Sequence, residues 1–197
     1  RDARVLLADI MDTVVVDPFF HAGIEDFFGL TARELYKAIR PGVWLQFERG
    51  ELDEQAYYTQ FFADGRGVDG AALVAWMRPR YRFVDGMEAL LAEANGAGIE
   101  VHALSNYPVW WRVIEDELCL SRYLQWRFVS CMTGVRKPDP GAYTGPLETL
   151  GVAAEQCLFT DDRAANVAAA EAVGMHGHTF ADADGLRIKM VQLGWLG

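Results

Sequence analysis

The sequence predicts an α/β protein with a Rossmann-like parallel sheet, helices on both faces of that sheet and a small inserted helical cap. Three observations lead to this fold class. Short apolar runs alternate with helical patterns of about ten residues beyond residue 85. Polar residues follow the ends of those runs. A helix-rich segment separates the first run from the others. We therefore expect a core of residues 1–16 and 85–197 and a cap of residues 17–84.

Composition narrows the class of protein. The chain has 197 residues, 51% of them hydrophobic, which is enough for one domain with an insertion. The 18 basic and 28 acidic residues give a net charge of −10, without a basic cluster, which argues against a nucleic-acid partner. No apolar run reaches the roughly 18 residues of a membrane span. The chain starts at Arg1 rather than Met, which is compatible with a removed targeting segment.

The cysteines are odd in number and lack paired spacing: Cys119, Cys131 and Cys157. Such a set forms neither a disulfide framework nor a zinc site, and it fits a reducing compartment. We expect all three to be small core residues.

The first strand covers residues 5–8 and runs directly into Asp9. An apolar run that ends on a carboxylate is typical of a buried parallel strand whose last residue reaches the carboxyl edge of the sheet, where open α/β folds bind ligands. Asp9 is therefore the first candidate for chemistry. An Asp that only begins a turn would give the same local pattern.

The cap segment shows apolar residues at helical spacing, interrupted by glycine and proline. We expect about four short helices there, with Thr31 and Asp53 (or Glu51) as starts of two of them, because their side chains can accept first-turn amide protons. The segment is rich in aromatic residues. Packing within the cap and against the core is the favoured role for them, and stacking against a flat substrate ring is the alternative.

The rest of the chain alternates regularly between strands and helices. We expect strands over residues 99–104, 127–131, 156–160 and 176–180, and helices over residues 87–94, 109–118, 140–150, 163–173 and 184–193. Strands of this length joined by helices imply βαβ units and a parallel sheet.

Four polar sites then fall at strand ends or just beyond them: Asp9, Ser105–Asn106, Lys137 and Asp161–Asp162. Each has a plain structural explanation, as a helix cap or a solvated charge. Together they gather a carboxylate nucleophile, a hydroxyl, an ammonium group and a carboxylate pair at one sheet edge. Three aspartates and one lysine would repel a phosphate unless a divalent cation were bound, and Mg²⁺ suits such hard oxygen ligands.

This set of groups predicts phosphate-ester chemistry. Asp9 would attack phosphorus and form an aspartyl phosphate. Ser105, Asn106 and Lys137 would bind the phosphate oxygens, with help from nearby backbone amides.

The order and spacing of these sites resemble the four motifs of the haloacid dehalogenase-like (HAD) hydrolase superfamily, most specifically in Lys-Pro-Asp-Pro (137–140) and Thr-Asp-Asp-Arg (160–163). The resemblance implies a HAD-type core and a cap over the active site. It also implies that Mg²⁺ binds Asp9, the backbone oxygen of Met11 and Asp162, with Asp161 beside the metal or bound through water.

One position departs from the family pattern. Phosphatases of this superfamily carry an acid/base aspartate where this chain has Met11. Methionine cannot transfer a proton, and loss of such a group typically costs about 10²–10⁴-fold in rate. The adjacent Asp12 stands where the family usually has glycine, and it is the candidate acid/base in place of Met11.

The segments Asp-Ile-Met-Asp-Thr (9–13) and Ser-Asn-Tyr-Pro-Val-Trp-Trp (105–111) are similar to those of the plant and algal chloroplast flavin mononucleotide (FMN) hydrolases. That resemblance implies FMN hydrolysis to riboflavin and phosphate, Mg²⁺ as cofactor and a chloroplast location. Met11 also leaves two alternatives open. One is a weakly active or inactive binding or scaffold protein, with a protein assembly partner, and the other is a metal-free dehalogenase.

Overall fold

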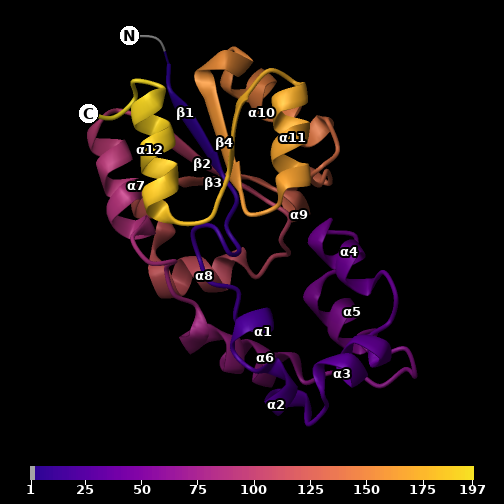
Figure 1. Ribbon diagram of the computed structural model, residues 1–197. Coiled ribbons are helices and arrows are strands. Elements are labelled where there is room, and N and C mark those ends of the chain that lie inside the picture. The colour runs from indigo at the N-terminus through magenta and orange to yellow at the C-terminus, as the bar shows by residue number, and fades with distance from the viewer. Residues whose placement is uncertain (1–2) are drawn as a thin grey trace.

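A five-stranded parallel sheet forms the centre of the computed structural model, which describes residues 3–197 (Figure 1). The strand order is β3-β2-β1-β4-β5. The strands are β1 (Val5–Ala8), β2 (Glu100–Ser105), β3 (Gln125–Val129), β4 (Cys157–Asp161) and β5 (His176–Thr179). All four pairings are parallel. Because β1 lies between β2 and β4, the residues that follow these three strands meet at one edge.

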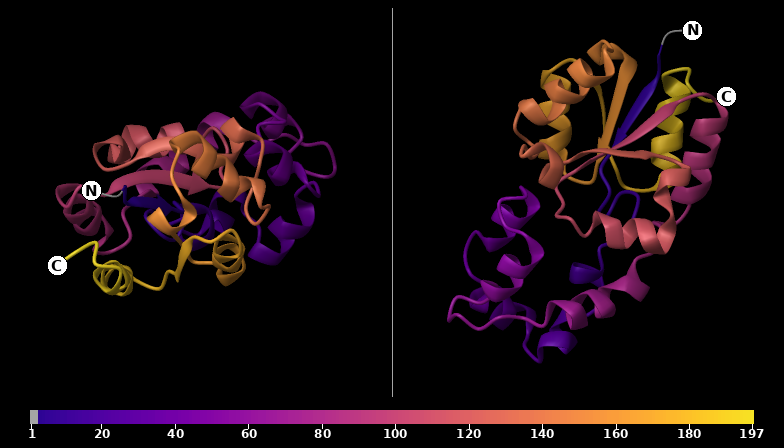
Figure 2. Two further views of the ribbon diagram at one scale, coloured as in Figure 1. Left: turned by 90° about the horizontal axis from the view of Figure 1, so that it is seen from above. Right: turned by 180° about the vertical axis from the view of Figure 1, so that it is seen from behind.

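Helices cover both faces of the sheet, which confirms the predicted fold class (Figure 2). Alternate residues of β1 enter two separate apolar cores, one containing Leu6 and the other Leu7, and both side chains are fully buried. The core helices are α7 (Met87–Gly96), α8 (Trp111–Leu118), α9 (Ser130–Thr133), α10 (Gly141–Leu150), α11 (Ala164–Ala172) and α12 (Ala183–Gln192), with short 3₁₀ turns η2 (Leu120–Arg122) and η3 (Ala154–Gln156).

The inserted segment is helical throughout and lies beyond the carboxyl edge of the sheet (Figure 1). It contains α1 (Pro18–His21), α2 (Ile24–Phe28), α3 (Ala32–Ala38), α4 (Val43–Glu48), α5 (Glu54–Thr59), α6 (Gly70–Met77) and η1 (Arg78–Arg80). The expected number of about four helices was too low. Gly23, Gly29 and Gly42 have φ of 74°, 65° and 78°, and these left-handed residues divide the segment into shorter helices. Thr31 and Asp53 are helix N-caps, as expected.

Two expectations about residues 119–131 are wrong. The third predicted strand ends at Val129, and Ser130 and Cys131 belong to α9, because the Ser130 backbone oxygen accepts from the Gly134 N–H at 2.8 Å and so closes a helical turn. The cysteines are not all core residues. Cys119 is exposed at a left-handed turn with φ of 50°, and only Cys157 is fully buried.

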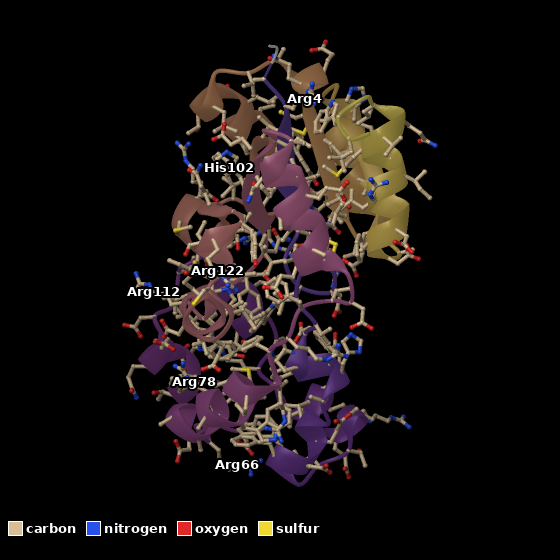
Figure 3. The ribbon with its side chains drawn as sticks, turned by 90° about the vertical axis from the view of Figure 1, so that its left-hand side faces the viewer. Arg4, Arg66, Arg78, His102, Arg112 and Arg122 are labelled. Atoms are coloured by element: carbon tan, nitrogen blue, oxygen red, sulfur yellow. The ribbon has the colours of Figure 1, made fainter. Side chains whose placement is uncertain are left out.

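Polar contacts fix the cap against the core. The buried Glu48 of α4 pairs with Arg136 at 2.6 Å, directly beside Lys137. The indole Nε1 of Trp110 donates to Glu54 of α5 at 3.0 Å. Arg78 of η1 pairs with Glu117 of α8 at 2.9 Å, and Figure 3 labels Arg78 on the face of the molecule where this contact lies. We propose residues 17–84 as the cap and the remainder as the core.

Candidate active site

Three carboxylates meet where β1 and β4 end. Asp9 follows β1, and its backbone N–H continues the sheet pattern by donating to the Thr160 oxygen at 3.0 Å. Asp161 is the last residue of β4, and Asp162 follows it. One side-chain oxygen from each of Asp9, Asp161 and Asp162 lies within 4.8 Å of the other two. The parallel register therefore brings together residues that are more than 150 positions apart.

Lys137 completes the charge pattern of this cluster. Its ammonium nitrogen lies 2.7 Å from Asp9 Oδ1 and 2.7 Å from Asp161 Oδ2, and its side chain is 2% exposed. A buried ammonium group needs such partners, because an unpaired charge in the interior is very costly. Lys137 thus holds Asp9 in place and leaves the second oxygen of that carboxylate for other contacts.

Asn106 positions the Lys137 loop. Its Nδ2 donates to the Lys137 backbone oxygen at 2.9 Å, and its Oδ1 accepts from the Lys137 backbone N–H at 2.8 Å. Both ends of the Asn106 amide are therefore used inside the protein. The second hydrogen of the Nδ2 group is not needed for this role, so the expected contact between Asn106 and phosphate stays a prediction.

Asp161 is held just as tightly. Its Oδ2 accepts from Lys137 and, at 3.0 Å, from Asn166, while its Oδ1 accepts from the Arg163 backbone N–H at 2.8 Å. With both oxygens engaged, Asp161 suits the place beside a metal or a link through water better than direct ligation.

Ser105 offers an unused polar group at the same edge. Its hydroxyl is buried, the residue is 2% exposed, and the hydroxyl has no hydrogen-bond partner within residues 3–197. Buried hydroxyls usually find partners, so an unpaired one at a ligand-binding edge fits an incoming acceptor such as a phosphate oxygen.

The cluster carries more negative charge than Lys137 can balance. Burial raises the pKa of the Asp9 carboxyl from 3.8 to about 7, Lys137 opposes this rise, and Asp161 and Asp162 add to it. Burial and the Asp161 carboxylate also raise the pKa of Asp162. A bound cation would reverse this and keep the carboxylates ionised.

The donor set fits a hard divalent cation. Among residues 3–197, Asp9 Oδ2 accepts a hydrogen bond only from the Thr13 hydroxyl, at 3.3 Å, and Asp162 is exposed to solvent. Within the described part of the chain, no backbone N–H donates to the Met11 carbonyl oxygen. Two carboxylates, a carbonyl and room for water match the preferences of Mg²⁺. These ligands are the ones that the family resemblance implies.

The backbone after Asp9 turns the Asp12 side chain toward the cap. Asp12 has φ of 60°, a left-handed conformation that Asp tolerates better than most residues. Its Oδ1 accepts from the Asp17 backbone N–H at 3.0 Å, and its Oδ2 lies 3.0 Å from His21 Nε2. The candidate acid/base is therefore bonded to α1 rather than to Asp9.

Asp17, the N-cap of α1, is a buried carboxyl group. Its side chain accepts from the Phe19 backbone N–H at 2.8 Å, and burial raises its pKa from 3.8 to about 6. Because the folded state binds this proton more tightly than the unfolded state, the stability that the group contributes is present below about pH 4 and is lost as the pH rises toward about 6.

Asp17→Asn should therefore stabilise the protein at neutral pH. Asn keeps the volume and can still cap the helix, but it has no charge to bury. We expect the variant to be more stable than the parent by about 2–3 kcal/mol at pH 8 and equal to it near pH 4. Denaturant unfolding at several pH values measures this. Asp53→Asn, at the exposed N-cap of α5, is the matched control and should show no such pH dependence. A difference for Asp17→Asn that does not vary with pH would contradict the assignment.

Several functional contacts were not found from the sequence. Thr13 bonds Asp9, Asn166 bonds Asp161, Glu48 pairs with Arg136, and His21 contacts Asp12. The sequence gives a weak indication for Asn166, because it is a polar residue on the inner face of an alanine-rich helix. The contacts of Glu48 and His21 depend on how the cap packs, which spacing does not reveal, and the contact of Thr13 depends on the path of the loop after Asp9.

The fold and this cluster together define a class of protein: a parallel α/β core with a helical insert and an acidic site at the carboxyl edge of its central strand. A family model described as haloacid dehalogenase-like hydrolase matches residues 14–174. The chain belongs to this family, and the expected fold and hydrolase class are confirmed.

Two curated relatives are named as a hydrolase and a phosphatase. The chain is 43% identical over 194 residues to the chloroplast protein flavin mononucleotide hydrolase 1 of Arabidopsis thaliana, covering 98% of this chain and 79% of that protein. It is 29% identical over 176 residues to a sesquiterpene phosphatase of Aspergillus oryzae, covering 83% and 85%. These relatives do not favour the alternative of an inactive scaffold.

Solved structures with the same fold include both phosphate-binding and dehalogenating enzymes. A HAD family enzyme from Bacteroides thetaiotaomicron, in complex with magnesium and inorganic phosphate, aligns with a TM-score of 0.71 at 18% identity over 91% of this chain and 95% of that one. The L-2-haloacid dehalogenase of Xanthobacter autotrophicus aligns with a TM-score of 0.64 at 18% identity over 96% and 83%. At these identities the likeness concerns the fold.

Among residues 3–197, no helix has the length and apolar character needed to cross a membrane.

Proposed function

We propose that this chain is a Mg²⁺-dependent phosphomonoesterase that hydrolyses FMN to riboflavin and phosphate. The observation that carries the proposal is the convergence of Asp9, Asp161 and Asp162 within 4.8 Å around Lys137. The FMN hydrolase of Arabidopsis thaliana, 43% identical to this chain, supports the choice of substrate. By the same relationship we propose a chloroplast location.

Each residue of the site has its own role in the proposed reaction. Asp9 attacks phosphorus, and the ester oxygen leaves as the Asp9–phosphorus bond forms. Lys137 and Ser105 bind the non-bridging phosphate oxygens, while Asn106 and Asp161 hold Lys137 in place. A water molecule then attacks the phosphorus of the aspartyl phosphate and releases Asp9. Asp9, Asp162 and the Met11 carbonyl oxygen would hold Mg²⁺, which supplies charge neutralisation to the phosphoryl group.

A phosphate-release assay tests this function. The protein is incubated with FMN, a panel of other phosphate esters and a short-chain haloacid, each with Mg²⁺ or with EDTA. We expect phosphate release from FMN that requires Mg²⁺, because the carboxylates would otherwise repel the substrate. Asp162→Asn should raise the Mg²⁺ concentration needed for half-maximal rate by at least about tenfold. Asp69→Asn, at the exposed N-cap of α6, is the control.

Two results would contradict the proposal. Halide release that persists in EDTA would indicate a metal-free dehalogenase. No phosphate release from any ester with Mg²⁺ would leave the protein without the proposed activity. Release from another ester but not from FMN would remove only the substrate assignment.

A further inference from the structure

The proposed reaction requires a proton that the residues described so far do not supply. The riboflavin oxygen of FMN is an alkoxide when it leaves, and such a poor leaving group needs a proton as the bond breaks. Met11 cannot donate one. Lys137 is buried and bonded to two carboxylates, and Asp9 forms the new bond to phosphorus. A different group must therefore protonate the leaving oxygen.

His21 of α1 lies beside the loop that follows the nucleophile Asp9. Its Nε2 is 3.0 Å from Asp12 Oδ2, and Asp12 belongs to the loop that directly follows Asp9. The side chains of His21 and Asp12 are 54% and 31% exposed, so both are accessible from solvent. Asp12 also directly follows Met11, whose carbonyl oxygen is one of the proposed metal ligands. The pair thus borders the metal-binding side of the cluster.

The other histidines are placed differently. His102 is fully buried within β2 and bonds Glu100 at 2.8 Å, and His176 and His178 belong to β5 at the edge of the sheet. Among the described residues, His21 is the histidine that contacts the loop after the nucleophile.

The contact with Asp12 also determines which nitrogen of His21 is available. A carboxylate accepts hydrogen bonds and does not donate them, so Nε2 carries its proton toward Asp12. Nδ1 is then the nitrogen that gains and loses a proton. A carboxylate that orients an imidazole in this way is a recurrent arrangement for proton transfer at reacting oxygens.

We propose that His21 is the catalytic acid/base of this chain, with Asp12 as its positioning residue, in place of the group that Met11 cannot provide. The inference rests on the proposed phosphatase function and extends it. In the first step the Asp9 oxygen bonds to phosphorus, the ester bond breaks with its electron pair on the leaving oxygen, and the Nδ1 proton of His21 moves to that oxygen. In the second step neutral Nδ1 takes a proton from the attacking water, and Asp9 leaves as a carboxylate.

Leaving-group dependence provides a test that a purely structural role would not pass. FMN needs a proton on its leaving oxygen, whereas p-nitrophenyl phosphate releases a stabilised phenolate without one. Because kcat/KM reports the first step alone, while the second step is common to both substrates, we expect His21→Gln to lower kcat/KM with FMN by about 100-fold and kcat/KM with p-nitrophenyl phosphate by no more than about threefold. His178→Gln is the matched control and should change neither. Since His21 is on the surface, the thermal stability of His21→Gln should stay close to that of the parent.

Chemical rescue provides a second readout. In His21→Ala, added imidazole should restore part of kcat/KM with FMN and have no effect on kcat/KM with p-nitrophenyl phosphate, because only the first step with FMN lacks its proton donor. An equal loss of kcat/KM on both substrates would mean that His21 only shapes the site and would overturn the proposal. An unchanged rate on FMN would overturn it as well. If FMN is not a substrate, the comparison uses the alkyl phosphate that the phosphate-release assay identifies. The role of His21 can then be refuted independently of the proposed substrate.

Discussion

Replacing Asp9 with Asn is expected to abolish phosphate release. Asn has nearly the same volume and can still accept the bond from Lys137, but its amide oxygen is a poor nucleophile toward phosphorus. Loss of a nucleophile that forms a covalent intermediate commonly lowers kcat by about 10⁴-fold or more. Steady-state phosphate release with saturating Mg²⁺ measures the effect.

The fold should survive this change. Burial and neighbouring carboxylates raise the pKa of Asp9 to about 7, so the ionised group costs stability above that pH when no metal is bound. At pH 8 without metal, Asp9→Asn should be at least as stable as the parent protein. Asp69→Asn, the same exchange at the exposed N-cap of α6, should retain full activity. Substantial turnover by Asp9→Asn would exclude Asp9 as the nucleophile.

Replacing Lys137 with Met is expected to damage both stability and activity. The lysine nitrogen is 2.7 Å from a carboxylate oxygen of Asp9 and of Asp161, and both carboxyl groups are almost fully buried. Without the ammonium charge these carboxylates repel each other in a medium that screens poorly. Removing one partner of a buried ion pair typically costs about 3–5 kcal/mol. Activity should fall as well, because the phosphate oxygens lose a cationic partner.

The pH dependence of this variant distinguishes the charge from the packing. Without Lys137, which opposes the rise, the pKa of the buried Asp9 carboxyl group rises further, so the folded variant binds this proton more tightly than the unfolded chain. The loss of stability should therefore be large at pH 8 and smaller near pH 5. Denaturant unfolding at both pH values measures it, with Lys37→Met on the exposed face of α3 as control. An equal loss at both pH values would indicate packing rather than charge.

The catalytic edge could be predicted from the sequence because a parallel sheet enforces it. Once Asp9, Ser105 and Asp161 are placed at the ends of neighbouring strands, their convergence follows from strand order alone. The structure agrees, with β1 between β2 and β4. Lys137 was found in the same way, from the loop that joins α9 to α10.

The roles of the polar partners could not be predicted in this way. Asn106 was expected to bind phosphate, but its amide also holds both backbone groups of Lys137, and only the three-dimensional path of that loop reveals this second role. Asp12 was treated by itself because nothing in its spacing indicates that a left-handed backbone turns it toward His21. The cap was divided into too few helices, since apolar spacing does not register each left-handed glycine.

The attachment of the cap was also hidden from sequence reasoning. Glu48 and Arg136 are 88 positions apart and form a pair in which Glu48 is almost fully buried. An acidic residue on a short helix and an arginine beside Lys137 both look like ordinary surface charges before the chain is folded. Their contact joins the cap to the loop that carries Lys137, so the insert and the catalytic edge are physically connected.

Trapping the covalent intermediate tests the central claim most directly. The protein is mixed with FMN labelled in its phosphate and Mg²⁺, quenched in acid within one turnover, digested and analysed by mass spectrometry. We expect the label on the peptide that contains Asp9, as an acyl phosphate that hydroxylamine removes. Label on a different residue, or phosphate release within one turnover without any label on the protein, would contradict nucleophilic attack by this carboxylate.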